Sequence, residues 1–356
     1  ARESGKFNKI KTLPYEGKNT EFLGYNDIKS SSKILGLFKD GDKVEEIKKG
    51  DEAILILDKT PFYAESGGQV GDSGHIQTNS EKFYVRDTIK IKKNVFGHVG
   101  ILESGTLKRN EQVEAFIDEP RRNDIKRNHS VTHLLHKALK IVLGNHVEQK
   151  GSLVDNLKTR FDFSHSKSIS NEEIHQIESI VNNEILTNQM THTQMMSIDK
   201  AKESGALMLF GEKYESEVRV LNIGNSIELC GGTHVKNTGD IGLFKIYSES
   251  GVASGVRRVE GVTGLNLIKF LNDQEEILTR ISKDLNTKTS EIPLKVSSIL
   301  TQLKENEKIQ SQLKSELALN QTDEMLSKTS KIDNFDYLCQ VIDNQGPNEL
   351  RDMIDK

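Results

Sequence analysis

The period of the hydrophobic pattern changes once along this chain, near Pro120, and that change limits the folds available to it. Before residue 118, apolar and β-branched residues form short, often alternating runs that turn residues separate, as in residues 82–91 (KFYVRDTIKI). After Pro120, apolar positions recur every three or four residues until Gly144 interrupts them. This pattern predicts a β domain, either a small barrel or a sandwich, followed by a domain that begins with a long helix.

The rest of the chain predicts an α+β multidomain protein. Residues 20–118 form the β domain, and residues 119–263, which mix strands with a helix capped by Ser170 and Glu173, form an α+β domain. Residues 264–330 contain two helical patterns separated by a break before Pro293, and the narrow apolar seam of the second favours a helical hairpin or coiled coil. Within residues 331–356 we expect a strand, a turn and the first turns of a helix. Because one such unit cannot bury its own faces, we expect the start of a truncated α/β domain here.

Composition excludes several classes of protein. The 356 residues include no apolar run long enough to span a membrane, and the first residues, ARESGKF, contain no secretory signal. Cys230 and Cys339 lie far apart, which favours a reducing compartment, so we expect a cytoplasmic protein. A net charge of −4 means that a nucleic-acid partner would have to bind local basic patches. The chain begins with Ala, which suggests a processed product or a piece of a longer protein.

Two motifs suggest a metal site. His129 and His133 lie four residues apart in the predicted helix, so both imidazoles face the same spot, although surface or core histidines would give the same spacing. About a hundred residues later, Cys230 and His234 flank the sequence GGT, whose glycines allow a tight turn; a small buried cysteine in an ordinary hairpin is the alternative. Four nitrogen and sulfur donors suit tetrahedral zinc, and the two motifs together predict one zinc ion per chain.

Longer stretches carry a resemblance to a known family. The segments TPFYAESGGQVGDSG, NHSVTHLLHKAL, QKGSLV, RFDFSH, ELCGGTHV and GVASGVRRVEGVTG occur in this order and resemble the editing region of alanyl-tRNA synthetases. The resemblance implies that residues 1–19 form a linker from an upstream part, that residues 20–118 form a barrel, and that residues 119–263 form a zinc-containing editing domain. Threonyl-tRNA synthetases share a related editing fold. The class II aminoacylation domain, which attaches alanine to tRNA(Ala) with ATP, has no counterpart here.

The resemblance also assigns residues. It implies zinc ligands at His129, His133, Cys230 and His234, a role in deacylation for Gln149, and recognition of the seryl side chain by Thr132. The Thr132 hydroxyl could equally bond to the helix carbonyl four residues before it. The glycine-rich loop is expected to reach the pocket, which makes Gly67, Gly68 and Gln69 further candidates. Basic candidates for the tRNA acceptor stem are Arg121, Arg122, Lys150, Arg257 and Arg258.

The implied function is zinc-dependent hydrolysis of tRNA(Ala) that carries serine or glycine by mistake. A ligation site built for alanine cannot reject glycine by size, because one methyl group contributes only about 1 to 3 kcal/mol of discrimination. Two alternatives stay open at this point. One is a free-standing deacylase acting in trans, and the other is a noncatalytic tRNA-binding and oligomerisation segment with structural zinc. We also expect a homo-oligomer formed through the C-terminal helices and no membrane partner.

Overall fold

The computed structural model describes residues 13–208 and 215–339, together with positions 341, 346, 347, 351 and 354. The chain divides into two compact units, Ala1–Phe270 and Leu271–Lys356, and each is described by itself. The first twelve residues of the predicted linker lie outside the described part. The finer division into five segments, which was predicted from the sequence, stays a prediction.

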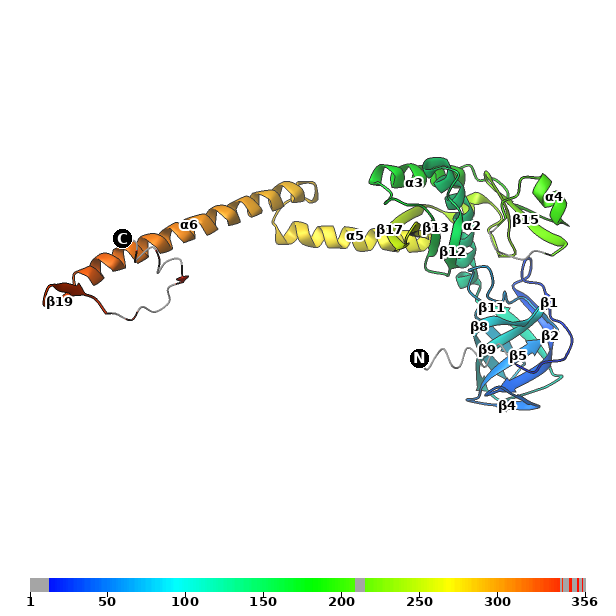
Figure 1. Ribbon diagram of the computed structural model, residues 1–356. Helices are drawn as coiled ribbons and strands as arrows, with labels where there is room; N and C mark the ends of the chain where they lie inside the picture. Colours follow the sequence, from blue (N-terminus) through cyan, green and yellow to red (C-terminus); the bar gives the residue numbers. More distant parts are fainter. Residues whose placement is uncertain are drawn as a thin grey trace. The chain divides into compact units, whose positions relative to one another are not determined.

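The N-terminal half of the first unit is a closed barrel of six strands (Figure 1). Their order around the barrel is β11, β7, β8, β9, β5 and β2, and β11 pairs with β2 to close it. The bounds are β2 Lys29–Lys39, β5 Glu52–Leu57, β7 Gly74–Gln77, β8 Lys82–Lys92, β9 Val95–Ser104 and β11 Gln112–Ile117. Shorter strands extend it: β1 Glu21–Phe22, β3 Asp42–Val44, β4 Glu46–Lys48, β6 Lys59–Thr60 and β10 Thr106–Lys108. Of the two β architectures that the sequence allowed, the barrel is confirmed.

The barrel core consists of side chains from alternate positions of its strands. In β11 every second side chain, including Val113, Ala115 and Ile117, points inward, as a period of two requires. We did not predict β2, because its first half, KSSSK, has few apolar residues. Its small Ser30 and Ser32 are buried and hydrogen-bond to each other at 2.7 Å, so they occupy inward positions that apolar residues usually fill.

The second half of the first unit packs helices against sheets. The predicted helix after Pro120 is α2, Glu119–Leu143, and the predicted capping box of Ser170 and Glu173 begins α3, Asn171–Leu186. A four-stranded sheet has the order β12 (Gln149–Val154), β13 (Thr159–Ser164), β18 (Val256–Thr263) and β17 (Phe244–Ala253). A three-stranded sheet contains β14 (His192–Ser197), β15 (Glu217–Ile223) and β16 (Ser226–Leu229), with α4 (Ile198–Glu203) and the 3-10 helix η1 (Thr238–Ile241) beside it in the sequence. One apolar core joins α2 and α3 to both sheets, so the buried face of α2 has a fixed orientation.

The second unit is mainly helical. Helix α5, Gly264–Asp284, begins in the first unit, and a 3-10 turn, η2 Thr289–Glu291, leads to α6, Ile292–Leu326. The apolar seam of α6 is exposed; Leu300, Leu313 and Leu317 each keep more than half of their surface. The pairing of the two helices as a hairpin therefore stays a prediction.

The chain continues into β19 (Ser330–Ile332) and β20 (Phe335–Tyr337), which form a short antiparallel pair. The helix that we predicted after them falls largely outside the described residues. Among the residues that the structure describes, no helix is both long and apolar enough to cross a membrane.

Candidate metal centre

The two histidine and cysteine motifs meet in space. His129 and His133 extend from the middle of α2, and Cys230 and His234 lie on the turn that follows β16. One donor atom from each of the four residues lies within 4.8 Å of the other three. The Cys230 Sγ atom is 3.2 Å from Nε2 of His234 and 3.5 Å from Nε2 of His129. In a tetrahedral zinc site, bonds of about 2.1 and 2.3 Å put such atoms about 3.6 Å apart, so the donor set fits zinc.

The far side of each imidazole is held by another residue. Nδ1 of His129 is 2.7 Å from Oε1 of Gln69, and Nδ1 of His133 is 2.6 Å from a carboxylate oxygen of Glu228. Nδ1 of His234 lies 3.3 Å from the Ser130 hydroxyl. The Nε2 atom of His133 is buried and has no hydrogen-bond partner among the described residues. Metal-bound histidines are oriented by such outer partners. A buried ring nitrogen without a hydrogen-bond partner is unusual, and a bound metal would satisfy it.

Charge in this cluster also suits a cation. Burial opposes ionisation of the Cys230 thiol, but the three nearby histidines lower its pKa well below the usual value for a thiol. Burial lowers the pKa of His133, yet the adjacent Glu228 carboxylate and Cys230 sulfur outweigh it and raise that pKa to about 10. Burial lowers the pKa of His234 to about 3. The carboxylate of Glu228 and the sulfur of Cys230 are thus two groups that favour negative charge in one enclosed place, and a dication bound there would replace the proton on His133 that balances them.

The cysteine turn is fixed by contacts on two sides. A Cβ at Gly232 would lie 2.1 Å from Cε1 of His129, so only glycine fits there. Arg219 on β15 donates hydrogen bonds from Nη1 to the carbonyls of Cys230 and Gly232, at 2.8 and 3.1 Å. Its guanidinium carbon lies 4.2 Å from the ring centre of Tyr25, whose hydroxyl donates to the Gly231 carbonyl at 2.8 Å. Residues of both the barrel and the α+β part therefore determine where the Cys230 sulfur points.

A cavity of about 420 Å³ opens beside the cluster. His129, His133 and Cys230 form part of its wall, and two residues assigned from the resemblance, Thr132 and Gln149, line it as well. Aromatic side chains and two lysines of the barrel also line the cavity: Phe22, Tyr25, Tyr63, Phe96, Lys90 and Lys93. The volume lies within the range of small-molecule sites, which begins at about 300 Å³.

Thr132 makes the contact that we gave as the alternative to substrate recognition. Its hydroxyl donates to the Asn128 carbonyl, four residues earlier, at 2.7 Å, and its oxygen lies 2.6 Å from that of Thr159. With its proton used in this way and one bond accepted from Thr159, the Thr132 oxygen retains one lone pair. Thr132 can therefore still accept a hydrogen bond from a ligand in the cavity.

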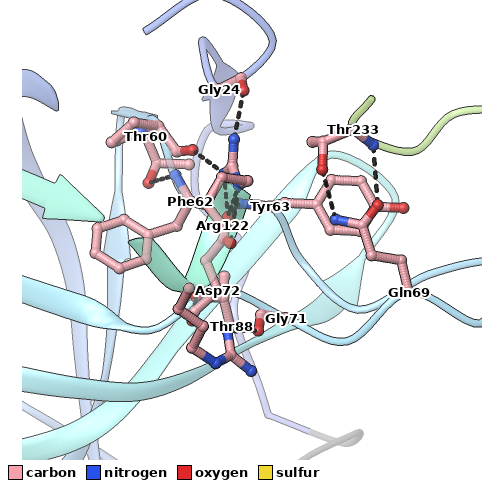
Figure 2. Close-up of polar contacts among 12 residues, drawn as sticks. Gly24, Thr60, Phe62, Tyr63, Gln69, Gly71, Asp72, Thr88, Arg122 and Thr233 are labelled. Atoms are coloured by element: carbon pink, nitrogen blue, oxygen red, sulfur yellow. Dashed lines mark hydrogen bonds and ion pairs between the residues drawn. The ribbon is translucent and has the colours of Figure 1, made fainter. Parts of the chain in front are cut away.

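The glycine-rich loop pairs with the end of β12. The Val154 amide donates to the Gly68 carbonyl at 2.7 Å, and a Cβ at Gly68 would lie 2.6 Å from the Ser152 carbonyl oxygen. Gly67 lines the cavity. Gln69 is fully buried, and it hydrogen-bonds to Thr233 (Figure 2). It also contacts His129, so its side chain does not face the open cavity.

The arginine candidates for RNA binding are largely used within the protein. Arg122 is 1% exposed, and its guanidinium binds the Asp72 carboxylate and the Gly24 carbonyl (Figure 2). It also donates to the Pro61 carbonyl. Arg122 is therefore unable to contact a phosphate, and its assignment is wrong. The other arginines bind neighbouring acceptors and are partly exposed: Arg121 to the Gly71 carbonyl, Arg257 to Glu249 and Arg258 to Asp162. Lys150 is exposed and lies 3.0 Å from Glu148.

Sequence reasoning missed three residues that hold the site: Glu228, Arg219 and Tyr25. A signal existed for Glu228, because residues two apart on a strand share a face, and Glu228 precedes Cys230 by two. Arg219 and Tyr25 gave no such signal, since their partners are backbone carbonyls of a distant turn.

Two family models match parts of the chain. Residues 2–121 match the family model described as tRNA synthetases class II (A), and residues 218–260 match the threonyl and alanyl tRNA synthetase second additional domain. The second match contains two of the four candidate ligands and Arg219. These matches relate the chain to class II aminoacyl-tRNA synthetases and, among them, to the threonyl and alanyl enzymes that carry this additional domain.

Individual relatives narrow the family. All 356 residues align with the alanine–tRNA ligases of Nitrosospira multiformis and Methylobacillus flagellatus at 49% identity, and with that of Aromatoleum aromaticum at 48%. In each case the chain covers 41% of the relative's length. The chain belongs to the alanine–tRNA ligase family.

Proposed function

We propose that this chain carries the editing activity of an alanine–tRNA ligase, the zinc-dependent hydrolysis of tRNA(Ala) that bears serine or glycine. The observation that carries the proposal is the convergence of four nitrogen and sulfur donors on the wall of a cavity that Thr132 and Gln149 also line. The partner is mischarged tRNA(Ala), and ATP is used only by the ligation domain of the parent protein, which attaches alanine to the same tRNA.

The bond to be broken is the ester between the amino acid and the terminal adenosine. Such an ester is already labile, so holding it beside a positioned water supplies much of the rate enhancement. Gln149 begins β12 at the cavity wall, where its amide can donate to a carbonyl and accept from a water. The remaining lone pair of Thr132 accepts a hydrogen bond from a seryl hydroxyl, a group that alanine lacks.

His129, His133, Cys230 and His234 would hold the zinc ion. If all four residues bind at once, the ion would fix the cavity wall, as in closed structural sites. If one of the four donors gave way, the ion would supply Lewis-acid chemistry for the ester carbonyl. Outer contacts from Gln69, Glu228 and Ser130 keep the three imidazole rings oriented toward the shared centre.

Incubation of the chain with Ser-tRNA(Ala) and Ala-tRNA(Ala), with and without a chelator, tests this function. We expect faster release of serine than of alanine, and loss of that release when the metal is removed. Cys230→Ala should abolish the activity, while Cys339→Ala, which changes the exposed second cysteine, should leave it intact. Equal slow release from both esters by the zinc-loaded chain would leave the noncatalytic tRNA-binding alternative.

An oligomer formed through the C-terminal helices is a separate part of the proposal. It is supported by the exposed apolar seam of α6, since an exposed row of leucines on a helix favours association. The molar mass of the chain in solution, measured by light scattering, tests it; a monomer at all concentrations would contradict it.

A further inference from the structure

We infer that Gln69, a residue of the barrel, positions the metal ligand His129 and so makes zinc affinity depend on the barrel. The inference rests on the proposed zinc site. Gln69 lies in the loop between β6 and β7, sixty residues before His129, and none of its surface is exposed. We had grouped it with substrate-binding candidates, but its contacts are with the site itself.

The orientation of the Gln69 amide follows from its partners. The backbone amide of Thr233 donates to Oε1 at 2.9 Å, and a backbone N–H can only donate, so the atom facing it must be the carbonyl oxygen. The other amide atom, Nε2, then donates to the Thr233 hydroxyl at 2.9 Å (Figure 2). Two bonds to one residue therefore fix which end of the amide is oxygen.

That oxygen determines the tautomer of His129. Nδ1 of His129 lies 2.7 Å from the same Oε1, and two acceptors at this distance would repel, so Nδ1 carries the hydrogen. Nε2, on the other side of the ring, is the atom that lies 3.5 Å from the Cys230 sulfur. With Nδ1 donating to Gln69, Nε2 is the ring nitrogen whose lone pair can bind a metal, so Gln69 orients His129 as outer partners of metal-bound histidines do.

The same side chain also fixes the second half of the site. Thr233 immediately precedes His234, so the pair of bonds from Gln69 to Thr233 holds the segment that carries this ligand. Loss of one outer contact typically lowers metal affinity ten- to a hundredfold, and Gln69 makes contacts to both halves. Gln69 is a positioning residue, because it acts through His129 and the turn.

The decisive experiment measures zinc affinity by chelator competition on the full chain, with the absorption spectrum of the cobalt-substituted protein as a second readout. Gln69→Leu removes the acceptor and should weaken zinc binding about ten- to a hundredfold and change the cobalt spectrum. Gln69→Glu restores an acceptor for Nδ1 of His129 and for the Thr233 amide, so it should bind within a few fold of wild type. Gln112→Met, at an exposed glutamine of the same barrel, is the matched control and should change nothing.

Each outcome has a distinct meaning. Wild-type affinity and an unchanged cobalt spectrum in Gln69→Leu would overturn this inference while leaving the zinc site in place. Equal weakening in Gln69→Leu and Gln69→Glu would also overturn it, because the acceptor oxygen would then have no special part. A wild-type chain that binds no zinc would instead refute the metal site of the proposed function.

Discussion

The buried ion pair of Arg122 and Asp72 provides a stringent test of how the barrel is attached to the helix that carries two candidate ligands. Arg122 lies in the first turn of α2, and Asp72 lies in a barrel loop; their side chains are 1% and 2% exposed. Nε of Arg122 is 2.9 and 3.0 Å from the two carboxylate oxygens, and its terminal nitrogens donate to the Gly24 and Pro61 carbonyls at 2.7 and 2.9 Å. Asp72 also accepts from the Tyr63 amide at 2.6 Å.

Replacement of Arg122 by Met fills similar space but leaves the carboxylate buried without a cation. Breaking one side of a buried pair costs about 3 to 5 kcal/mol. Each carbonyl left without a donor adds about 1 to 3 kcal/mol, although losses within one network add incompletely. We therefore expect the free energy of unfolding to fall by about 4 to 6 kcal/mol.

Urea unfolding at pH 7, followed by circular dichroism, measures this loss. The control is Arg86→Met, which breaks the exposed pair of Arg86 and Glu52, 51% and 53% exposed, and should cost less than about 1 kcal/mol. Adding Asp72→Asn to Arg122→Met removes the buried charge and should recover part of the loss. If Arg122→Met were no more destabilising than Arg86→Met, or the second change recovered nothing, the reasoning would be refuted.

Three further predictions concern the site and the barrel. Gly232→Ala should weaken zinc binding at least tenfold, because the added Cβ would collide with His129. In the control, Gly231→Ala, the added Cβ would lie in open space, and zinc affinity should be normal. Equal zinc affinities of the two variants would contradict the geometry. Thr132→Val should slow deacylation of the seryl ester more than that of the glycyl ester, and an equal effect on both would exclude recognition of the seryl hydroxyl. Burial lowers the pKa of His98 from 6.5 to about 4, so the unfolded chain binds more protons than the folded chain between these pH values. The stability that neutral His98 contributes is therefore present above pH 6.5 and is lost as the pH falls toward 4. Relative to His98→Gln, the wild type should lose about 3 kcal/mol over this interval in denaturant titrations, and a pH-independent difference would contradict the assignment.

The four candidate ligands could be predicted because each motif is local. The helical period predicts that His129 and His133 share a face, and Cys230 and His234 flank two glycines of a turn. Local pattern does not contain the meeting of two segments about a hundred residues apart. Their matching donor types suggested it, the resemblance to a family supported it, and the structure brings the four donors within 4.8 Å.

Arg122 shows where local reasoning fails. A basic residue at the start of a helix, next to another arginine, has the composition of a phosphate-binding patch, and nothing nearby in the sequence indicates a buried partner. Its partner, Asp72, lies fifty residues earlier in a loop whose position depends on closure of the barrel. An ion pair between residues so far apart in the sequence depends on the tertiary fold, and local hydrophobic periodicity does not predict it.

The contacts of Gln69, Arg122 and Tyr25 make the barrel part of the candidate site. Gln69 contacts Thr233 across a sequence separation of 164 residues, and Tyr25 contacts Gly231 across 206. Both contacts converge on the turn that carries Cys230 and His234, while Arg122 anchors the start of the helix that carries the other two ligands. Cutting the chain near residue 118 would therefore remove contacts from both halves of the cluster, although all four donors lie beyond the cut. For the proposed zinc site, we therefore expect metal affinity to depend on the whole first unit, because the barrel orients candidate ligands that it does not itself supply.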